Sequence, residues 1–281
     1  MKIFTEADKL QKWTEARRKA GKRIALVPTM GALHAGHLSL VDAAKKKGAD
    51  EIVLSIFVNP IQFGPKEDFA KYPRCAEADL AKCRKAGVTA VFAPKAEEMY
   101  AKDHSIFIDE RLLGKTLCGQ RRPGHFRGVC TVVAKLFNLT RPHFAVFGQK
   151  DYQQLLIIRR MVRDLNFDVK IVSAPIVREA DGLALSSRNA YLSPEDRTKA
   201  LALSRSLMEL QKDVRREDEL EWRPRRILIV RYLRENGLNV DYVEAVDPET
   251  LEPMDVLVHG RTIVLLAVYC GGTRLIDNAF V

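Results

Sequence analysis

Short apolar runs alternate with amphipathic stretches through the first 175 residues, and this alternation constrains the fold more than any other feature. The strand-like runs cover residues 23–28, 51–57, 88–93, 145–147 and 169–173. The helical stretches between them cover residues 38–47, 76–86, 128–138 and 152–166. Strand–helix alternation favours parallel strands joined by right-handed crossovers. The sequence therefore predicts an α/β fold with a Rossmann-like, doubly wound parallel sheet.

The pattern changes near residue 175, which predicts a second and smaller α+β domain. A polar, glycine-containing loop at 179–189 precedes two helical stretches, 194–212 and 221–236. Strand-like runs follow at 239–246, 262–269 and 273–276, with Gly271 and Gly272 suited to a hairpin turn between the last two. We therefore expect a first domain over residues 1–174 and a second over residues 175–281.

The net charge of +10 does not by itself identify the kind of molecule that the protein binds. Nucleic acid, a polyanionic small molecule such as ATP, and a merely basic surface all remain open explanations. Basic clusters at 215–216 and 223–231 lie among acidic residues in a helical stretch, which indicates a solvated helix face. Aromatic residues make up 7% of the chain and do not interleave with Arg or Lys, which argues against a stacking surface for single-stranded RNA.

Cysteine usage and the N-terminal sequence indicate a cytoplasmic protein. The five cysteines are scattered and form no Cys-x-x-Cys pair, so reduced thiols are expected. No apolar run approaches the roughly 18 residues of a membrane span. Acidic residues appear before any apolar core of the kind found in a signal peptide.

A His-x-x-His pair, His34 and His37, follows the first strand-like run and precedes a helix. A glycine turn between a strand and a helix lets backbone N–H groups and the helix dipole approach an anion. Imidazoles placed there can donate to phosphate oxygens as charge develops. A zinc pair or a core histidine is the alternative, although zinc ligands on a helix would sit better at i, i+4 with a third ligand nearby. We interpret the segment as a nucleotide-phosphate turn.

Several further motifs, in order along the chain, extend this interpretation. They are residues 27–38, 55–63, 72–74, 122–128, 147–154, 181–189 and 274–278. Together they resemble the pantothenate synthetase family, a branch of the nucleotidyltransferase superfamily that carries the His-x-Gly-His signature. The resemblance implies that the chain condenses pantoate with β-alanine to give pantothenate, AMP and pyrophosphate. Pantoate would first attack the α-phosphate of ATP to form an acyl adenylate, which the β-alanine amine would then attack.

The resemblance also implies which residues contact ATP. His37, His34 and Lys150 would be catalytic, with His37 the proton donor and Lys150 the cation at the α-phosphate. Val177 would offer a backbone contact to adenine, and Asp151 would contact ribose or cap the following helix. The full set implied for ATP is Met30, Gly31, Ala32, Leu33, His34, Ala35, Gly36, His37, Gly148, Gln149, Lys150, Asp151, Val177, Leu185, Ser186, Ser187 and Arg188.

Gln62 and Gln154 match the pair that would bind pantoate and β-alanine, since a neutral amide can both donate and accept. Asp79 is a candidate for Mg²⁺ or for β-alanine, whereas Arg122 and His125 fall in a matching motif without an assigned role. No protein-held metal is otherwise implied, because Mg²⁺ would arrive bridging the phosphates of ATP. Residues 63–73 are interpreted as a flap that excludes water.

The resemblance further implies a homodimer, a first domain that binds nucleotide and pantoate, and a second domain that acts as a lid. Two other functions stay open at this stage. A nucleotidyltransferase of the same superfamily would share the His-x-Gly-His signature but keep the nucleotide in its product. A non-catalytic RNA-binding protein is suggested only by the charge. Neither a membrane nor a nucleic acid is expected as a partner under the first interpretation.

Overall fold

The computed structural model describes residues 1–65, 67–217 and 219–281 and divides into two compact units. Unit 1 comprises Met1–Gln149 and Gln153–Pro175. Unit 2 comprises Lys150–Tyr152 and Ile176–Val281. The short segment Lys150–Tyr152 is thus grouped with the C-terminal part of the chain, although its neighbours on both sides belong to unit 1.

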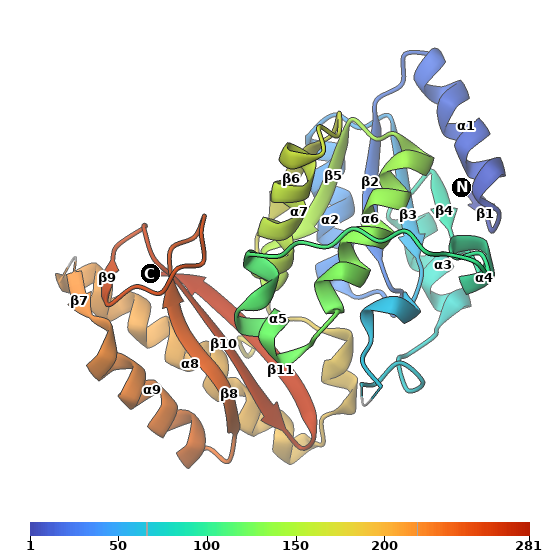
Figure 1. Ribbon diagram of the computed structural model, residues 1–281. Coiled ribbons are helices and arrows are strands. Elements are labelled where there is room, and N and C mark those ends of the chain that lie inside the picture. The colour runs from blue at the N-terminus through green and yellow to red at the C-terminus, as the bar shows by residue number, and fades with distance from the viewer. Residues whose placement is uncertain (66, 218) are drawn as a thin grey trace. The chain divides into compact units, whose positions relative to one another are not determined.

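Unit 1 is built on a six-stranded parallel sheet (Figure 1). Its strands are β1 (Lys2–Phe4), β2 (Ile24–Thr29), β3 (Glu51–Ile56), β4 (Ala90–Phe92), β5 (Phe144–Gly148) and β6 (Lys170–Ala174). Their spatial order is β1-β4-β3-β2-β5-β6, and every neighbouring pair is parallel. The predicted α/β class is confirmed.

The helices of unit 1 connect and cover these strands. They are α1 (Ala7–Lys19), α2 (Ala35–Lys46), α3 (Ala76–Lys85), α4 (Ala96–Met99), α5 (Leu117–Arg121), α6 (His125–Thr140) and α7 (Tyr152–Asp164), with short 3-10 turns η1 (Pro60–Gln62), η2 (Leu113–Lys115) and η3 (Gln149–Asp151). One core forms where α2 and α3 meet the sheet, and it includes Val27, Val41, Leu54 and Cys83. Helices α1 and α6 pack on each other beside β2.

The strand order places a topological switch point between β2 and β5, because the chain proceeds outward in opposite directions from these two strands. In open α/β sheets, ligands bind beyond the carboxyl ends of the strands at such a point. The turn after β2 and residues Gly148 and Gln149 at the end of β5 therefore occupy the edge of the sheet where a ligand is expected.

Unit 2 combines two long helices with an antiparallel sheet. Helices α8 (Pro194–Glu217) and α9 (Trp222–Glu235) accompany strands β8 (Asn239–Val246), β10 (Ile263–Cys270) and β11 (Thr273–Phe280), in the order β11-β10-β8. A small ribbon pairs β7 (Glu219–Glu221) with β9 (Val256–Val258), and η4 spans Ser187–Tyr191. Leu203, Leu207, Leu233 and Leu266 are among the buried residues of its core.

The expected strands and helices are present, with a few informative differences. Helix α6 begins at His125 rather than residue 128, because Gly124 takes the left-handed backbone (φ 81°) that starts it. Strand β11 continues to Phe280 instead of ending at residue 276. Strand β1 and helix α1 were not predicted. The basic stretch in α8 and α9 is helical and paired with acids, as in Arg225–Asp213 and Arg231–Glu235.

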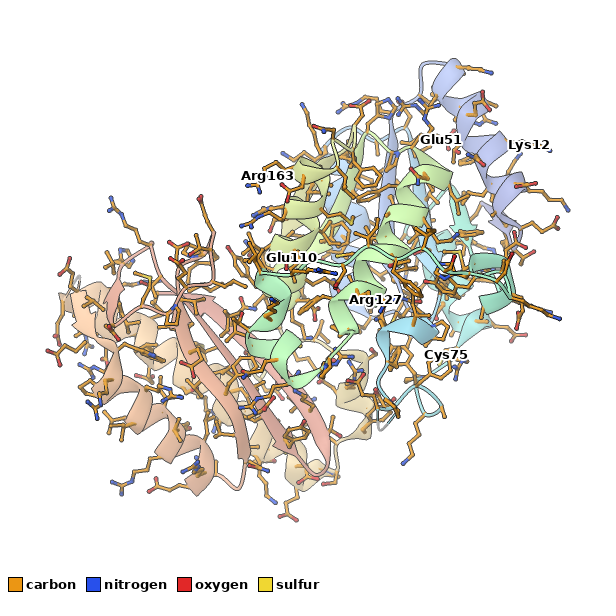
Figure 2. All side chains as sticks on the ribbon, viewed as in Figure 1. Lys12, Glu51, Cys75, Glu110, Arg127 and Arg163 are labelled. Atoms are coloured by element: carbon orange, nitrogen blue, oxygen red, sulfur yellow. The ribbon has the colours of Figure 1, made fainter. Side chains whose placement is uncertain are left out.

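All five cysteines are free thiols. Cys75 is exposed just before α3 (Figure 2). The other four cysteines are buried. Burial, with the charge of Asp79, raises the pKa of the Cys83 thiol to about 11. Among the helices formed by the described residues, none combines the length and apolar character needed to cross a bilayer.

Candidate functional site

The turn between β2 and α2 needs an unusual backbone. Gly31 has φ +84° and Ala32 has φ 50°, both in the left-handed region. A Cβ on residue 31 would lie 3.0 Å from Ile56 Cγ2 and 3.1 Å from Asp79 Oδ2, so only glycine fits there without displacement. Gly36, by contrast, lies in the first turn of α2. The turn is therefore a specific conformation that other groups must hold in place.

Asp79 and Lys82 of α3 hold this turn. The Asp79 carboxylate is 1% exposed and accepts hydrogen bonds from the N–H groups of Ala32 and Leu33, each at 2.8 Å. The Lys82 ammonium donates to the carbonyl of Leu33 at 2.5 Å. Because both carboxylate oxygens are engaged by the backbone, we assign Asp79 to support of the turn rather than to a metal ion or β-alanine. The described residues contain no group of three or more His, Cys, Asp or Glu side chains that could hold a metal.

His34 and His37 are brought together at the start of α2. Their ring centroids are 4.0 Å apart, and the backbone N–H of His34 donates to Nδ1 of His37 at 3.3 Å. A neutral imidazole that accepts at Nδ1 carries its proton on Nε2. His37 is thus held in the tautomer whose Nε2–H can donate to an anion. This donor adds to the positive end of the α2 dipole.

A polar network orients Gln62 beside the same turn. Asn59, 1% exposed, accepts from the Tyr100 hydroxyl at 2.8 Å and donates to Gln62 Oε1 at 3.0 Å. With its oxygen so engaged, Gln62 directs its amide nitrogen to the sulfur of Met30 at 3.3 Å. Met30 lies in the turn itself, so the structure joins the candidate carboxylate-binding amide to the candidate phosphate turn. Nothing in the local sequence around Tyr100 indicates its part in this network.

Arg122 and His125 have no role assigned from the sequence. In the structure they hold the main-chain carbonyl of Gln62 through a chain of hydrogen bonds. Arg122 donates to Nε2 of His125 at 3.0 Å, and Nδ1 of His125 donates to the Gln62 carbonyl at 2.9 Å. Arg122 also makes a bidentate pair with Glu67, with both distances 2.7 Å. Burial would raise the pKa of Glu67, but the hydrogen bonds and charge of Arg122 outweigh it and hold that pKa below its usual value.

Glu67 belongs to the segment 63–73, interpreted above as a flap. Lys66, within that segment, lies outside the described residues. Phe63 packs its ring edge-on against Phe69 at 5.3 Å and Tyr72 at 6.1 Å. The three rings form a cluster within the segment, and the pair between Glu67 and Arg122 joins the segment to the rest of unit 1.

The two adjacent glutamines of α7 have different environments. Gln153 is 5% exposed and its amide bonds the backbone of Leu113, Thr116 and Cys118. Gln154, the residue matched to the ligand-binding pair, is only half-buried. Gln153 is therefore committed to the fold, which leaves Gln154 as the candidate for a ligand.

Of the other predicted ATP residues, Gly148 and Gln149 belong to unit 1, and those from Lys150 onward belong to unit 2. The N–H of Leu185 donates to the carbonyl of Val177 at 3.0 Å, which folds the 185–188 turn back on Val177. The Ser186 hydroxyl accepts from the Arg188 N–H at 3.2 Å and starts η4. Lys150 and Asp151 lie in η3, with ammonium and carboxylate 3.9 Å apart. Unit 2 thus contains the ammonium of Lys150, the hydroxyls of Ser186 and Ser187 and the guanidinium of Arg188.

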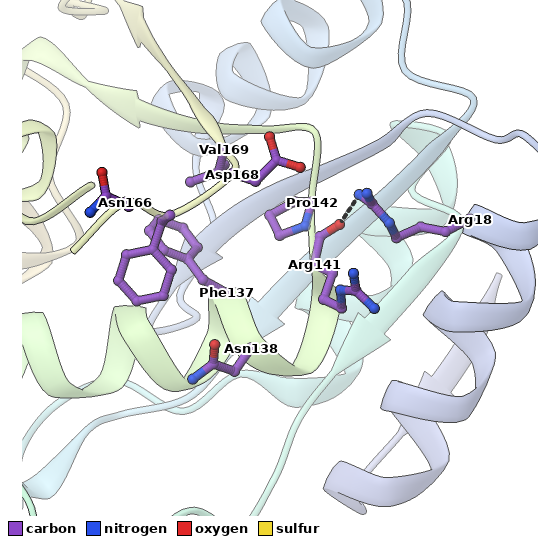
Figure 3. A pocket seen from close by; sticks show the side chains of 9 residues that line it. Arg18, Phe137, Asn138, Arg141, Pro142, Asn166, Asp168 and Val169 are labelled. Carbon is purple, nitrogen blue, oxygen red and sulfur yellow. Dashed lines mark hydrogen bonds between the residues drawn. The ribbon is translucent and has the colours of Figure 1, made fainter. Parts of the chain in front are cut away.

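A cavity of about 170 Å³ lies elsewhere in unit 1, before the amino ends of β5 and β6 (Figure 3). Its lining includes Arg18, Phe137, Arg141 and Asp168, and Arg18 donates to the Arg141 carbonyl at 2.6 Å. None of the predicted site residues lines it. Because ligands of parallel sheets bind beyond the opposite ends of the strands, we place the candidate site at the β2 turn and not here.

Comparisons with known proteins show the family of this chain. The model of the family described as pantoate-beta-alanine ligase matches residues 2–280. The pantothenate synthetase of Thermotoga petrophila is 50% identical over 279 residues, covering 99% of each chain. The crystal structure of pantothenate synthetase from Thermus thermophilus has a TM-score of 0.90 at 43% identity, covering 100% of this chain and 99% of that one.

A second solved structure adds ligands to the comparison. Pantoate-beta-alanine ligase from Francisella tularensis, complexed with beta-gamma ATP and beta-alanine, has a TM-score of 0.82 at 31% identity. It covers 100% of this chain and 97% of that one.

Asp79→Asn should loosen the β2 turn, because an amide cannot accept from both N–H groups of Ala32 and Leu33. We expect a loss of about 1–3 kcal/mol in the free energy of unfolding by urea, with faster hydrogen exchange of the amides at 32 and 33. Asp42→Asn is the matched control, since Asp42 is exposed on α2 and pairs only with Lys45 among the ion pairs described. Equal stability and exchange in the two variants would contradict the assigned role.

Glu67→Gln should destabilise the protein at neutral pH and progressively less in acid. The folded-state pKa of Glu67 lies below its ordinary value of 4.5, so its ion pair stabilises above that pH. The contribution is lost as pH falls through the folded-state pKa. Urea unfolding of wild type and variant between about pH 7 and pH 3.5 measures this difference. Glu235→Gln, in an exposed pair with Arg231, should change little at either pH.

Proposed function

The chain belongs to the pantoate-beta-alanine ligase family, and on this premise we propose that it joins pantoate to β-alanine at the expense of ATP. The contact between Gln62 and Met30 is the observation that most supports the proposal, because it joins the amide that we assign to pantoate to the turn that we assign to phosphate. The family match favours this reaction over the transfer of a nucleotide into the product. It likewise leaves the RNA-binding interpretation without support beyond net charge.

The first step joins two anions, so the site must overcome their repulsion. The pantoate carboxylate attacks the α-phosphorus of ATP, a P–O bond forms, and pyrophosphate leaves with the electron pair of the broken P–O bond. Positive charge and fixed hydrogen-bond donors at the phosphate oxygens lower this barrier. We assign these roles to His34, His37 and the α2 N-terminus in unit 1, and to Lys150, Ser186, Ser187 and Arg188 in unit 2.

His37 is the proposed proton donor of the site. Its Nδ1 accepts from the His34 N–H, so we assign the ring proton to Nε2, from which it would donate to a phosphate oxygen as charge builds. Met30 to Gly36 supply the backbone of the nucleotide turn, with Gly148 and Gln149 at the end of the adjacent strand. Lys150 and Asp151 continue from there, and Val177 offers main-chain groups to adenine next to the Leu185–Arg188 turn.

Gln62 and Gln154 are the proposed ligands of pantoate and of the β-alanine that follows it. Neutral amides bind a carboxylate and a hydroxyl without adding charge. A cation at the same place would stabilise the ground-state carboxylate and blunt its attack. In the second step the β-alanine amine attacks the acyl carbon of the adenylate, AMP leaves, and the amine nitrogen loses a proton to give the amide.

Mg²⁺ enters in this proposal as part of the ATP substrate. The described residues offer no cluster of metal ligands, and the Asp79 carboxylate is engaged by Ala32 and Leu33. A cation that bridges phosphate oxygens needs few protein ligands and would neutralise part of their charge.

The proposal also covers the organisation of the enzyme. Residues 1–174 would bind nucleotide and pantoate, and residues 175–281 would act as a lid. We further propose a cytoplasmic homodimer, with ATP, pantoate and β-alanine as its small-molecule partners. Light scattering of the purified protein distinguishes a dimer from a monomer.

Pantoate-dependent exchange of labelled pyrophosphate into ATP, without β-alanine, tests the adenylate step. Wild type should catalyse it, and His37→Ala and Lys150→Ala should each slow it by about 10²–10³-fold, as expected on removal of one donor from a charged transition state. His259→Ala and Lys12→Ala are exposed controls and should exchange at the wild-type rate. Folded wild-type protein without exchange would refute the proposal.

A further inference from the structure

Strand β11 carries two adjacent polar residues that are almost completely buried. Asp277 and Asn278 are each 3% exposed, in a strand paired along its length with β10. Buried polar groups are costly unless hydrogen-bonded, so the partners of these two side chains show why the strand retains them.

Asn278 holds the main chain at Lys150. Its side-chain amide donates to the Lys150 carbonyl at 2.9 Å, and both residues belong to unit 2. Two residues on, the Phe280 ring packs edge-on against Tyr152 at 5.6 Å, and the Tyr152 hydroxyl donates to the Pro248 carbonyl at 2.9 Å. Residues two apart on a strand point to the same side. Side chains on one face of β11 therefore contact the Lys150–Tyr152 segment at both of its ends, at Lys150 and at Tyr152.

Asp277 fixes the neighbouring segment of the same unit. Its carboxylate forms a bidentate pair with Arg178 at 2.6 and 2.9 Å, and Arg178 also donates to the Gly182 carbonyl at 3.1 Å. The backbone N–H of Asn278 donates to Oδ1 of Asp277 at 2.8 Å, so the Asp277 carboxylate also contacts the main chain of Asn278. The strand that holds Lys150 is thus bonded to the segment that leads into the 185–188 turn.

We propose that Asn278 is a positioning residue for the adenylation step, which it serves by fixing the backbone from which the Lys150 side chain extends. A lysine ammonium sits on a flexible four-carbon chain, so its place depends on where its own backbone is held. Loss of the anchor lets the cation sample positions away from the phosphate, and small misplacements cost large factors in rate. The inference rests on the proposed function of Lys150.

Asn278→Ala should reduce kcat of pantoate-dependent pyrophosphate exchange by about 10–100-fold while KM for ATP and pantoate changes little. Hydrogen exchange of the 150–152 amides should become faster. Asn278→Ser is a milder variant, because its hydroxyl is too short to reach the Lys150 carbonyl. If the alanine variant does not fold, the serine variant should show the same lower kcat with little change in KM.

The double variant Lys150→Ala/Asn278→Ala separates positioning from general destabilisation. If Asn278 acts through Lys150, the double variant should be no slower than Lys150→Ala alone, because coupled sites are not additive. Asp241→Asn is the matched control: it breaks the buried pair with Arg274 in the same sheet without touching Lys150, and it should keep the wild-type kcat.

Two results would overturn the inference while leaving the proposed function intact. One is a wild-type kcat in both Asn278 variants. The other is a loss of rate that multiplies fully with that of Lys150→Ala. A Lys150→Ala variant that exchanges pyrophosphate at the wild-type rate would also overturn the inference, because Lys150 would then have no role in adenylation. Wild-type protein without exchange would overturn the proposed function itself.

Discussion

The buried carboxylate of Asp79 is the interaction on which the candidate nucleotide turn depends. Its two oxygens bind the N–H groups of Ala32 and Leu33, where the backbone takes a left-handed course through Gly31 and Ala32. That course brings the chain from the end of β2 to the start of α2, with His34 as the residue before the helix. A buried carboxylate with good partners can maintain such a backbone, whereas the left-handed conformation of Ala32 is unfavourable for an alanine on its own.

Elsewhere in the candidate site, too, the residues that would contact substrate differ from the residues that hold them in place. The histidines and Lys150, which we expect to contact substrates, are half-buried, whereas Gln62 is 8% exposed, and buried polar groups that would not touch substrate hold Gln62 and the backbone of Lys150. Asn59 and His125 hold Gln62, and Asn278 holds the backbone of Lys150. The groups that we propose for phosphate binding come from both parts of the chain, since the histidines belong to unit 1 and Lys150 to unit 2.

The sequence predicted the fold well where local periodicity decides it, and less well where distant contacts decide it. The strands and helices of the doubly wound sheet follow from apolar spacing. The predicted strand ends at residue 276 because Asp277 and Asn278 interrupt the apolar pattern. These two residues are buried in β11, where their hydrogen-bond partners lie 99 and 128 residues away in the sequence. The resemblance suggests Asp79 as a candidate for Mg²⁺ or β-alanine, and the sequence does not show its support of the turn because the N–H groups that it accepts from lie 47 and 46 residues earlier. The resemblance also predicts residues that would face substrate, but the residues that support them carry no local signal.

The β2 turn is predicted to hold His37 with its proton on Nε2, from which it can donate to ATP. Imidazole ¹⁵N NMR of histidine-labelled protein, at a pH where the ring is neutral, measures this directly. The account predicts an acceptor-type resonance for Nδ1 and a protonated Nε2, with the Nε2 resonance shifting when ATP and pantoate are added and unchanged by pantoate alone. A proton on Nδ1, or no response of either nitrogen to ATP, would contradict it.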